Sequence, residues 1–327
     1  MSLTKVPLRP SEVEAFVQRA FGSAVRVVAS REAQGGMYNA GYHLRLAGGG
    51  PSRVFLKVAP PDDISCLTHE RGLMRAELDT LRRLTLAGVG AAPAVLAADL
   101  DRAVVDRDAV FLQHFPGVPL AGIPEALAEE RAASLRGRIG ALAAQFRTVT
   151  APAYGYPHRK ALQAPSWPQA FARMLDTAFD DALRFEISPA LESLRPGLLA
   201  AAAALPHPDA PRLVHYDLWD GNVLVRRAGA GWAITGVIDW ERAFYGDPLA
   251  EVVSLAFHAG GEPHPALLTA LKVRLDAEAR RRLALYRAYL WLVMIVEATP
   301  RGFTRTRPAS WMAAVRRRLE RDVAEAQ

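Results

Sequence analysis

The spacing of hydrophobic residues changes about a third of the way along the chain. Before residue 115, short runs rich in β-branched and aromatic residues predict five strands, and apolar positions at helical spacing predict two helices. The predicted strands span residues 24–32, 38–46, 53–59, 94–100 and 109–115, and the predicted helices span 11–21 and 67–87. We therefore expect the first part of the chain to form a small sheet with helices packed against it.

Long stretches rich in alanine and leucine dominate the rest of the chain. They predict helices at 127–149, where the apolar stripe begins at Leu127, at 168–185 and 188–204, and from residue 248 onward. Three short strands interrupt this helical half, at 212–215, 223–226 and 232–238. Because prolines and a glycine punctuate residues 116–119, we predict one lobe over residues 1–115, a hinge near 111–119 and a second lobe over 116–327.

The composition is that of a globular protein with a large core. The chain has 327 residues, of which 50% are hydrophobic and 23% are charged. Its longest uncharged apolar run, 288–296, is much shorter than the about 20 residues that a bilayer requires, and the N-terminus lacks the apolar segment of an export signal. A single cysteine, Cys66, excludes an intramolecular disulfide and a cysteine-built zinc site. We expect a cytoplasmic protein with no membrane partner.

The positive net charge is spread thinly along the chain. Residues 1–115 carry 14 basic and 12 acidic side chains, and residues 116–327 carry 26 and 22. Short arginine clusters occur only at 280–282 and 316–318, and no aromatic residues or glycines are interleaved with them. A solvated helix face is therefore favoured over a nucleic-acid site, and we expect no nucleic-acid partner.

Polar residues at fixed offsets stand out in the strand-containing part of the second half. Residues 215–222 read HYDLWDGN, and Asp239 follows 17 residues after Asn222 at the end of an apolar strand. This order matches the H-x-D-L-x-x-x-N loop of kinases. Phosphoryl transfer needs a carboxylate that orients the attacking hydroxyl, and oxygen ligands that hold magnesium on the nucleotide phosphates. We assign the first role to Asp217 and the second to Asn222 and Asp239, and we expect His215 to support the loop.

The segments HYDLWDGNVLV and VIDWERAFYGDPLAEVVSL together resemble the aminoglycoside phosphotransferase family, small-molecule kinases related in fold to protein kinases. The resemblance is strong over residues 214–255. It implies an α+β, two-lobed, protein-kinase-like fold with a small N-terminal lobe, built from an antiparallel sheet plus a helix, and a larger, mainly helical C-terminal lobe. It also implies Mg²⁺ and ATP or GTP as phosphoryl donor. Each of these residues alone would favour a structural role instead, with Asp217 in a polar turn and Asp239 as a strand cap. Tyr216 stands where many family members carry a small residue.

Lys57 lies inside an apolar strand, where its charge requires a partner. The chain has four lysines against 36 arginines, so a compact ammonium at this position suggests contact with the phosphates of a nucleotide. A lysine that faces solvent from a strand edge is the alternative. We expect Glu77, 20 residues further on, to pair with Lys57, and Glu70 is the second choice.

Three further sets of residues have expected roles. Gly35 and Gly36, between the first two strands, are expected to approach the phosphates, although they lack the G-x-G-x-x-G spacing and a simple turn is the alternative. The segment of Gln113, His114 and Phe115 resembles the hinge whose backbone binds the purine, which leaves ATP versus GTP open. Asp247 is expected to cap the next helix and brace the loop before it.

The acceptor is expected to be a small molecule with a free hydroxyl. Asp247 and Pro248 follow Asp239 within nine residues, which leaves no room for a peptide-docking segment. Five acidic residues could attract a polycation or could form a solvated face: Asp176, Asp180, Asp181, Glu186 and Glu192. Because the second lobe carries net positive charge, we expect a neutral or weakly charged acceptor. An antibiotic is the first choice. A metabolic sugar or amino-alcohol kinase, and a nucleotide-binding pseudokinase, are the alternatives.

Overall fold

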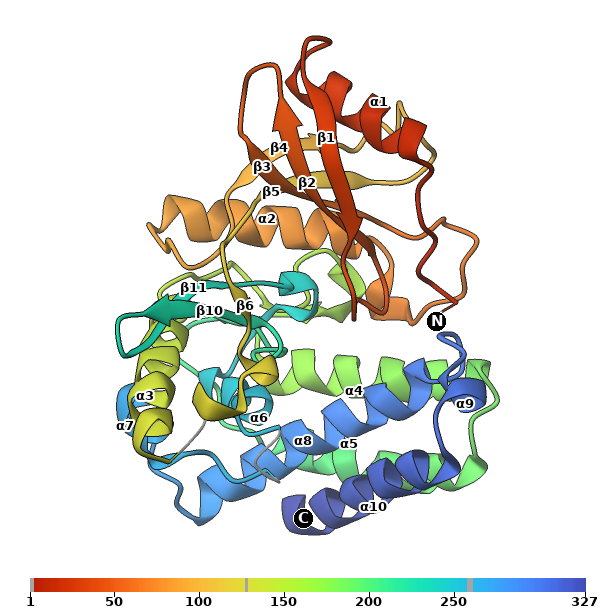
Figure 1. Ribbon diagram of the computed structural model, residues 1–327. Coiled ribbons are helices and arrows are strands. Elements are labelled where there is room, and N and C mark those ends of the chain that lie inside the picture. Colours follow the sequence, from red (N-terminus) through yellow and green to blue (C-terminus); the bar gives the residue numbers. More distant parts are fainter. Residues whose placement is uncertain (1–2, 127–128, 258–260) are drawn as a thin grey trace.

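A five-stranded antiparallel sheet forms most of the N-terminal lobe (Figure 1). The computed structural model describes residues 3–126, 129–257 and 261–327. The strands are β1 (Arg26–Glu32), β2 (Ala40–Ala47), β3 (Arg53–Val58), β4 (Val95–Asp99) and β5 (Ala109–Gln113), in the order β1-β2-β3-β5-β4. All five appear where the alternation of the sequence predicted them, within a few residues at each end.

Two helices cover opposite faces of this sheet. Helix α1 (Pro10–Phe21) packs on the face that carries Leu56, and α2 (Leu73–Leu86) packs with Val110, which points to the other face. The single helix predicted over 67–87 is interrupted. A short 3₁₀ turn at Thr68–Glu70 comes first, and Gly72, in the left-handed conformation with φ 83°, separates it from α2. The Glu70 and Glu77 side chains therefore do not share a helix face.

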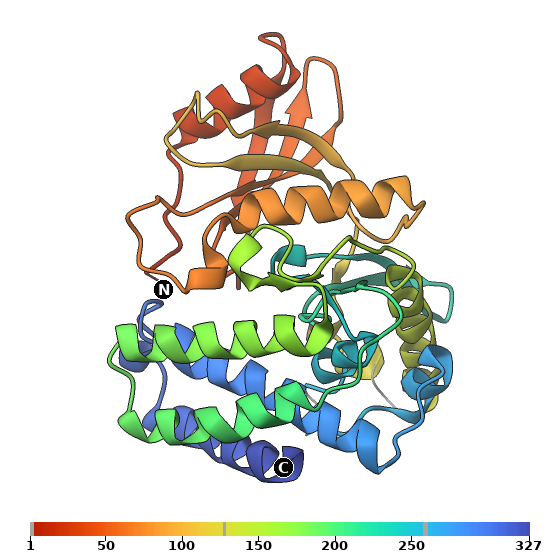
Figure 2. The same cartoon turned by 180° about the vertical axis from the view of Figure 1, so that it is seen from behind.

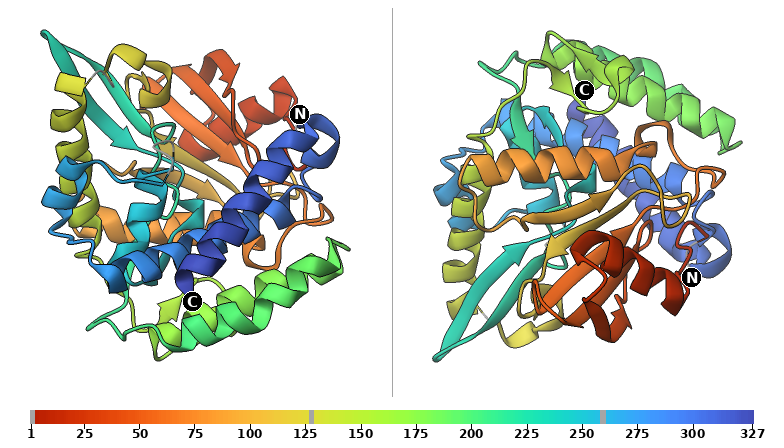
Figure 3. Two further views of the ribbon diagram at one scale, coloured as in Figure 1. Left: turned by 90° about the horizontal axis from the view of Figure 1, so that it is seen from below. Right: turned by 90° about the horizontal axis from the view of Figure 1, so that it is seen from above.

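The C-terminal lobe is mainly helical. Its helices are α3 (Glu129–Phe146), α4 (Trp167–Arg184), α5 (Arg195–Ala203), α6 (Glu251–Leu255), α7 (Pro265–Leu271), α8 (Ala277–Glu297), α9 (Phe303–Thr306) and α10 (Ala309–Ala326). Leu127, where the stripe of α3 was expected to begin, lies outside the described residues. Seen from behind, α4 crosses the molecule just below the N-terminal lobe (Figure 2). In Figure 3, α10 lies toward the viewer in the view from below, and α1 lies toward the viewer in the view from above. Helix α10 packs against α8.

Short strands at the top of the C-terminal lobe carry the polar motif. They are β9 (Arg212–Val214), the hairpin of β10 (Val223–Ala228) and β11 (Gly231–Val237), and β12 (Phe244–Gly246), which pairs with β9. Three more two-residue strands complete these sheets: β6 (Val118–Pro119), β7 (Tyr154–Gly155) and β8 (Gln163–Ala164). The sequence did not predict β6, β7, β8 or β12, because two or three residues carry no readable alternation.

The chain passes from the first sheet to the second between β5 and β6. Strand β5 pairs with β3, and β6 pairs with β10 of the C-terminal lobe, so residues 114–117 connect the two. The lobe boundary at residue 115 remains a prediction. Within the described ranges, no helix is both long enough and apolar enough to cross a bilayer.

Candidate active site

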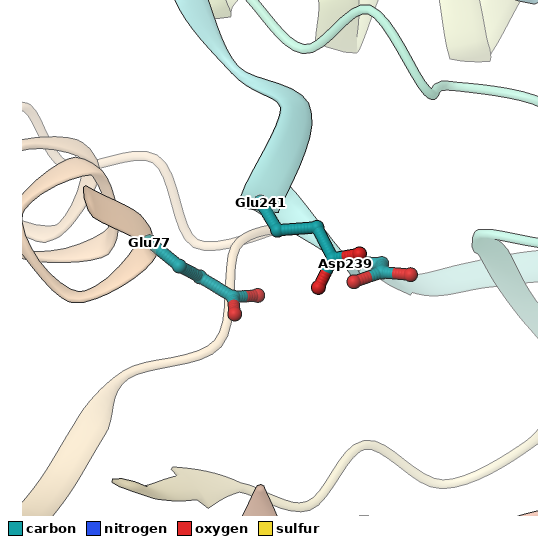
Figure 4. A group of neighbouring side chains, drawn as sticks. All are labelled: Glu77, Asp239 and Glu241. Atoms are coloured by element: carbon teal, nitrogen blue, oxygen red, sulfur yellow. The ribbon is translucent and has the colours of Figure 1, made fainter. Parts of the chain in front are cut away.

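Three carboxylates surround the buried ammonium of Lys57 at the junction of the two lobes. Lys57 Nζ lies 2.7 Å from Glu77 Oε2 of α2, 2.7 Å from Asp239 Oδ1 and 3.1 Å from Glu241 Oε2. Figure 4 shows the three acidic side chains converging from α2 and from the segment after β11. Of the two glutamates that the sequence offered as partners, Glu77 contacts Lys57, and Glu70 bonds to Arg301 instead. We call Lys57 and its three carboxylate partners the lysine cluster.

The lysine cluster contains more negative than positive charge. Burial alone would lower the pKa of Lys57, but the charges of Asp239, Glu241 and Glu77 raise it well above its usual range. Burial, reinforced by the charge of Asp239, raises the pKa of Glu241 to about 7. Each of the three carboxylates offers an oxygen within 4.8 Å of the others. Such a group of oxygens suits a hard cation such as Mg²⁺.

A left-handed residue turns the chain after β11 toward Lys57. Asp239 has φ 67°, a conformation that aspartate adopts more readily than most residues because its short polar side chain bonds locally. The next amide, Trp240 N, donates to Glu77 Oε1 at 3.1 Å, which ties the turn to α2. Glu241, two residues on, also accepts a hydrogen bond of 2.6 Å from Asn39 Nδ2 of the loop between β1 and β2.

A second group of contacts shapes the loop between β9 and β10. Asn222 Nδ2 donates to the carbonyl and to the carboxylate of Asp217, at 2.8 and 2.9 Å. Asp217 N donates to His215 Nδ1 at 3.2 Å, and His215 Nε2 lies 3.1 Å from the Ile238 carbonyl oxygen. The imidazole therefore bridges the loop to the residue before Asp239, so that Asp217, Asn222 and Asp239 are held next to one another.

Burial dominates the electrostatics of this loop. It raises the pKa of Asp217 to about 8; the charge of Arg242 opposes the rise, and that of Asp239 adds to it. Burial likewise lowers the pKa of His215 to about 4, so the ring is neutral at pH 7. A neutral ring with one accepting and one donating nitrogen fits the two hydrogen bonds that it makes.

Two buried acidic residues, Asp247 and Glu251, support this region through hydrogen bonds. Asp247 caps the turn after it through Leu249 N at 2.9 Å, and its other oxygen accepts from Tyr286 Oη at 2.8 Å. The direct contacts to the loop are made by Glu251, whose carboxylate accepts from His215 N at 2.8 Å and Tyr216 N at 3.2 Å. Sequence reasoning missed Glu251, although a carboxylate four residues after Asp247 in an otherwise apolar segment was a signal for it.

The glycine loop leaves open space beside its backbone. Gly35 has φ 92°, and nothing lies within 4 Å of the position that a Cβ would take there, while at Gly36 only the Asn39 carbonyl oxygen comes within 3.5 Å. No contact of either glycine with Lys57 or Asp217 occurs among the described residues. The two glycines are therefore accessible to a ligand but are not part of the lysine cluster.

The expected hinge residues lie along the edge between the two sheets. Gln113 pairs with β3, and its side chain accepts from Ala94 N at 3.3 Å. The His114 ring lies 5.5 Å from the His43 ring. The Phe115 ring covers Gly236 of β11 so closely that a Cβ there would lie 2.1 Å from it. The structure therefore places these three residues next to β2, β3 and β11.

Most of the acidic residues on α4 and in the segment after it contact partners within the chain. Arg195 contacts Asp176, Asp180 and Glu192 at 2.5, 2.8 and 3.1 Å. Asp181 is buried and accepts from both the amide and the hydroxyl of Thr68, each at 2.7 Å. Four of the five acidic residues are therefore occupied by partners within the chain.

Comparison with known proteins shows the family. The family model described as "Phosphotransferase enzyme family" matches residues 30–286. No curated protein sequence matches the chain at a significant level.

Similar solved structures cover nearly the whole chain. A thermostable mutant of aminoglycoside phosphotransferase APH(4)-Ia, in a ternary complex with ADP and hygromycin B, has a TM-score of 0.64 at 18% identity and covers 96% of this chain and 98% of that one. A putative fructosamine-3-kinase from Thermobifida fusca YX-ER1 has a TM-score of 0.60 at 24% identity, with coverage of 98% and 99%. A choline/ethanolamine kinase family protein from Mesorhizobium loti has a TM-score of 0.60 at 16% identity, with coverage of 97% and 98%. The predicted α+β, two-lobed, protein-kinase-like fold is thereby confirmed.

Proposed function

We propose residue roles and an acceptor class for this protein, which belongs to the phosphotransferase enzyme family and is a small-molecule kinase with a hydroxyl group as acceptor. The proposed donor is ATP or GTP with Mg²⁺. The observation that carries the residue roles is the convergence of Lys57, Glu77 and Asp239 beside the loop of Asp217 and Asn222.

Each side chain has a role that its contacts support. Lys57, oriented by Glu77, binds the phosphates of the nucleotide. Asn222 and Asp239 would hold magnesium, which neutralises phosphate charge when bound, and the excess of carboxylate oxygen around Lys57 fits such an ion. Asp217 accepts the hydrogen of the attacking hydroxyl and directs its oxygen at the γ-phosphorus, while the bond to the β,γ-bridging oxygen breaks.

The remaining expected residues support this core. Gly35 and Gly36, which have open space beside their backbone, would approach the phosphates, and residues 113–115 would bind the purine through main-chain groups. His215 and Asp247 stabilise the loop and the turn after it. These roles leave the choice between ATP and GTP to experiment.

We propose an antibiotic that is not strongly polycationic as acceptor. Four of the five acidic residues that could attract a polycation are paired within the chain. Similar solved structures include complexes with hygromycin B, which makes an antibiotic the first choice. The names of two others, a fructosamine kinase and a choline/ethanolamine kinase family protein, favour a metabolic sugar or amino alcohol as the second candidate.

Mass spectrometry of a mixed panel tests the proposal. The protein is incubated with Mg²⁺, either ATP or GTP, and a panel of antibiotics, sugar amines and amino alcohols, and products heavier by one phosphoryl group are sought. The Asp217→Asn variant is the matched control and should give no product. If nothing is phosphorylated while nucleotide still binds, the pseudokinase alternative replaces the proposed function. Full activity of Asp217→Asn would instead remove the role of that carboxylate.

A further inference from the structure

Tyr216, directly before Asp217, has an unusual backbone conformation. Its φ is 60°, in the left-handed region that favours glycine and is uncommon for a bulky residue. This conformation explains why a small residue suits the position. A strained residue of this kind persists only where its surroundings determine its conformation, and such residues cluster at functional sites.

The contacts of the Tyr216 side chain help to fix this backbone conformation. Only 2% of the residue is exposed, and its ring lies 5.0 Å from the Phe244 ring of β12 and 6.0 Å from the Tyr289 ring of α8. Its hydroxyl donates a hydrogen bond of 2.6 Å to the backbone carbonyl of Tyr286 in the middle of α8. The phenol therefore connects the loop to the central helix of the C-terminal lobe.

Tyr286, whose carbonyl accepts the Tyr216 hydrogen bond, is itself held in place by side-chain contacts. The Tyr286 hydroxyl donates to Asp247 Oδ2 at 2.8 Å and accepts from Trp167 Nε1 of α4 at 2.9 Å. On the backbone side, Glu251 accepts from the amides of His215 and Tyr216. Tyr216 is thus bonded to α8 through its side chain and to α6 through its main chain.

We propose that Tyr216 is a positioning residue for phosphoryl transfer. Its hydrogen bond to α8 holds the left-handed turn from which Asp217 projects, and so keeps the Asp217 carboxylate beside Asn222 and the segment before Asp239. The inference rests on the proposed role of Asp217. A catalytic group must be placed to within a fraction of an ångström, and a misplacement of about 1 Å can reduce the rate about 10²-fold.

Tyr154 provides a matched control in the same lobe. It is also buried, with 3% exposure, and its hydroxyl donates to a backbone carbonyl, that of Pro208, at 2.7 Å. Unlike Tyr216, it is not among the described residues with positive φ, and it lies on β7 outside the loop. Replacing either tyrosine with phenylalanine removes one hydroxyl that donates to a backbone carbonyl, in a buried hydrogen bond at Tyr216 and a partly buried one at Tyr154.

The first experiment compares Tyr216→Phe with Tyr154→Phe by steady-state release of inorganic phosphate from Mg·ATP and Mg·GTP, with water as acceptor. We expect Tyr216→Phe to lower kcat about tenfold with an unchanged KM for nucleotide, because transfer and not binding depends on the position of Asp217. Tyr154→Phe removes a hydrogen bond in the same lobe but outside the loop, and it should leave kcat unchanged. Equal kcat values in the two variants would overturn the inference.

A second measurement does not depend on turnover. Hydrogen exchange of peptides that cover residues 213–223 should be faster in Tyr216→Phe than in wild type, and unchanged in Tyr154→Phe. Tyr216→Gly removes the strain together with the hydrogen bond, and it should lose at least as much kcat as Tyr216→Phe. Unchanged exchange, or a fully active Tyr216→Gly variant, contradicts positioning by the side chain.

The outcome for Asp217→Asn separates the inference from the proposed function. If Asp217→Asn abolishes phosphate release and Tyr216→Phe behaves like Tyr154→Phe, only the role of Tyr216 fails. If Asp217→Asn is fully active, the proposed role of Asp217 fails, and the inference fails with it. If the wild-type protein neither releases phosphate nor phosphorylates an acceptor, the proposed function itself fails.

Discussion

Two buried groups of charged residues lie between the lobes, and they differ in their balance of charge. The lysine cluster combines one ammonium with three carboxylates. The second group, which we call the arginine seam, combines two guanidinium groups with two carboxylates. Its members are Glu70, Arg242, Glu297 and Arg301.

The balance of charge indicates what each group does. In the seam, Arg301 contacts both Glu70 and Glu297, and Arg242 donates to Glu297 at 2.7 Å, so the charges are matched within the chain. The seam thereby joins the turn before α2 to α8 and the segment after it. In the lysine cluster the excess of negative charge calls for a cation from outside, which fits a nucleotide-bound metal ion. One group stabilises the fold, and the other is suited to binding a ligand.

The largest effect is expected from breaking the seam. Arg301→Met leaves Glu70 and Glu297 buried without that partner, and the loss of one member of a buried ion pair costs about 3–5 kcal/mol. Urea unfolding measures this loss. The double variant Arg301→Met/Glu70→Gln removes one of the two carboxylate charges and should recover part of the stability. An unchanged midpoint in the single variant would contradict a structural role for the seam.

Removing the cation of the lysine cluster should lower the rate of phosphoryl transfer. Lys57→Met removes the group that contacts Glu77 and Asp239, and we expect phosphoryl transfer to fall about 10²–10³-fold, the range for loss of one donor to a transition-state charge. Phosphate release from Mg·ATP and Mg·GTP measures it. Because three carboxylates are then without their lysine, Mg²⁺ should raise the melting temperature of this variant more than that of wild type. Wild-type turnover would refute the assignment.

Reducing the excess charge of the cluster should weaken metal binding moderately. Glu241→Gln keeps the size of the side chain and its ability to accept from Asn39, but it removes the negative charge that Glu241 carries above its pKa of about 7. We expect magnesium affinity in the presence of nucleotide to fall about tenfold, as for residues that support metal ligands. Titration calorimetry with Mg²⁺ checks this, and Glu192→Gln, on the surface near Arg195, is the control. Unchanged affinity would show that the charge of Glu241 is not used.

The last effect is absent at neutral pH, appears only on acidification, and concerns a histidine beside the seam. His69 is buried and stacks on the Tyr156 ring, 5.2 Å away. Burial, the charges of Arg242 and then His158, and the weaker repulsion of Arg301 lower the pKa of His69 to about 3, while Glu297 opposes this change. An unfolded histidine, with a pKa of about 6.5, therefore binds a proton that the folded protein excludes.

This proton makes stability depend on pH in a defined direction. The contribution of neutral His69 is complete above about pH 6.5 and is lost as the pH falls toward 3, by about 1.4 kcal/mol per pH unit. The difference in unfolding free energy between wild type and His69→Phe should therefore change between pH 6.5 and 4.5, with the variant losing less on acidification. A constant difference over this range would contradict the pKa shift.

Local patterns predicted much of the fold and several residues that meet at the candidate site. The strands of the first sheet and the helices α4 and α8 follow from alternation and helical spacing, and Lys57, Asp217, Asn222 and Asp239 stood out by motif and by their apolar surroundings. The contact of Glu77 with Lys57 followed the expected spacing. The reasoning about Glu70 assumed an unbroken helix, and Gly72 interrupts that helix.

Other residues could not be found from local patterns because their partners are distant in the chain. Asn39 bonds to Glu241 across 202 positions, and Arg301 to Glu70 across 231. Tyr216 was visible only as an unusual residue, since its partner, the carbonyl of Tyr286, is 70 positions away.

Hydrophobic periodicity and the polar motif act over a few residues, so the sequence by itself determined the elements, the class of chemistry and the residues next to one another in each motif. Burial and charge balance depend on which distant segments come together. Only the tertiary structure therefore decided that one group of ionised residues is neutral overall and another carries excess negative charge, that most of the acidic residues on and after α4 have partners within the chain, and that Tyr216 holds its strained turn through α8.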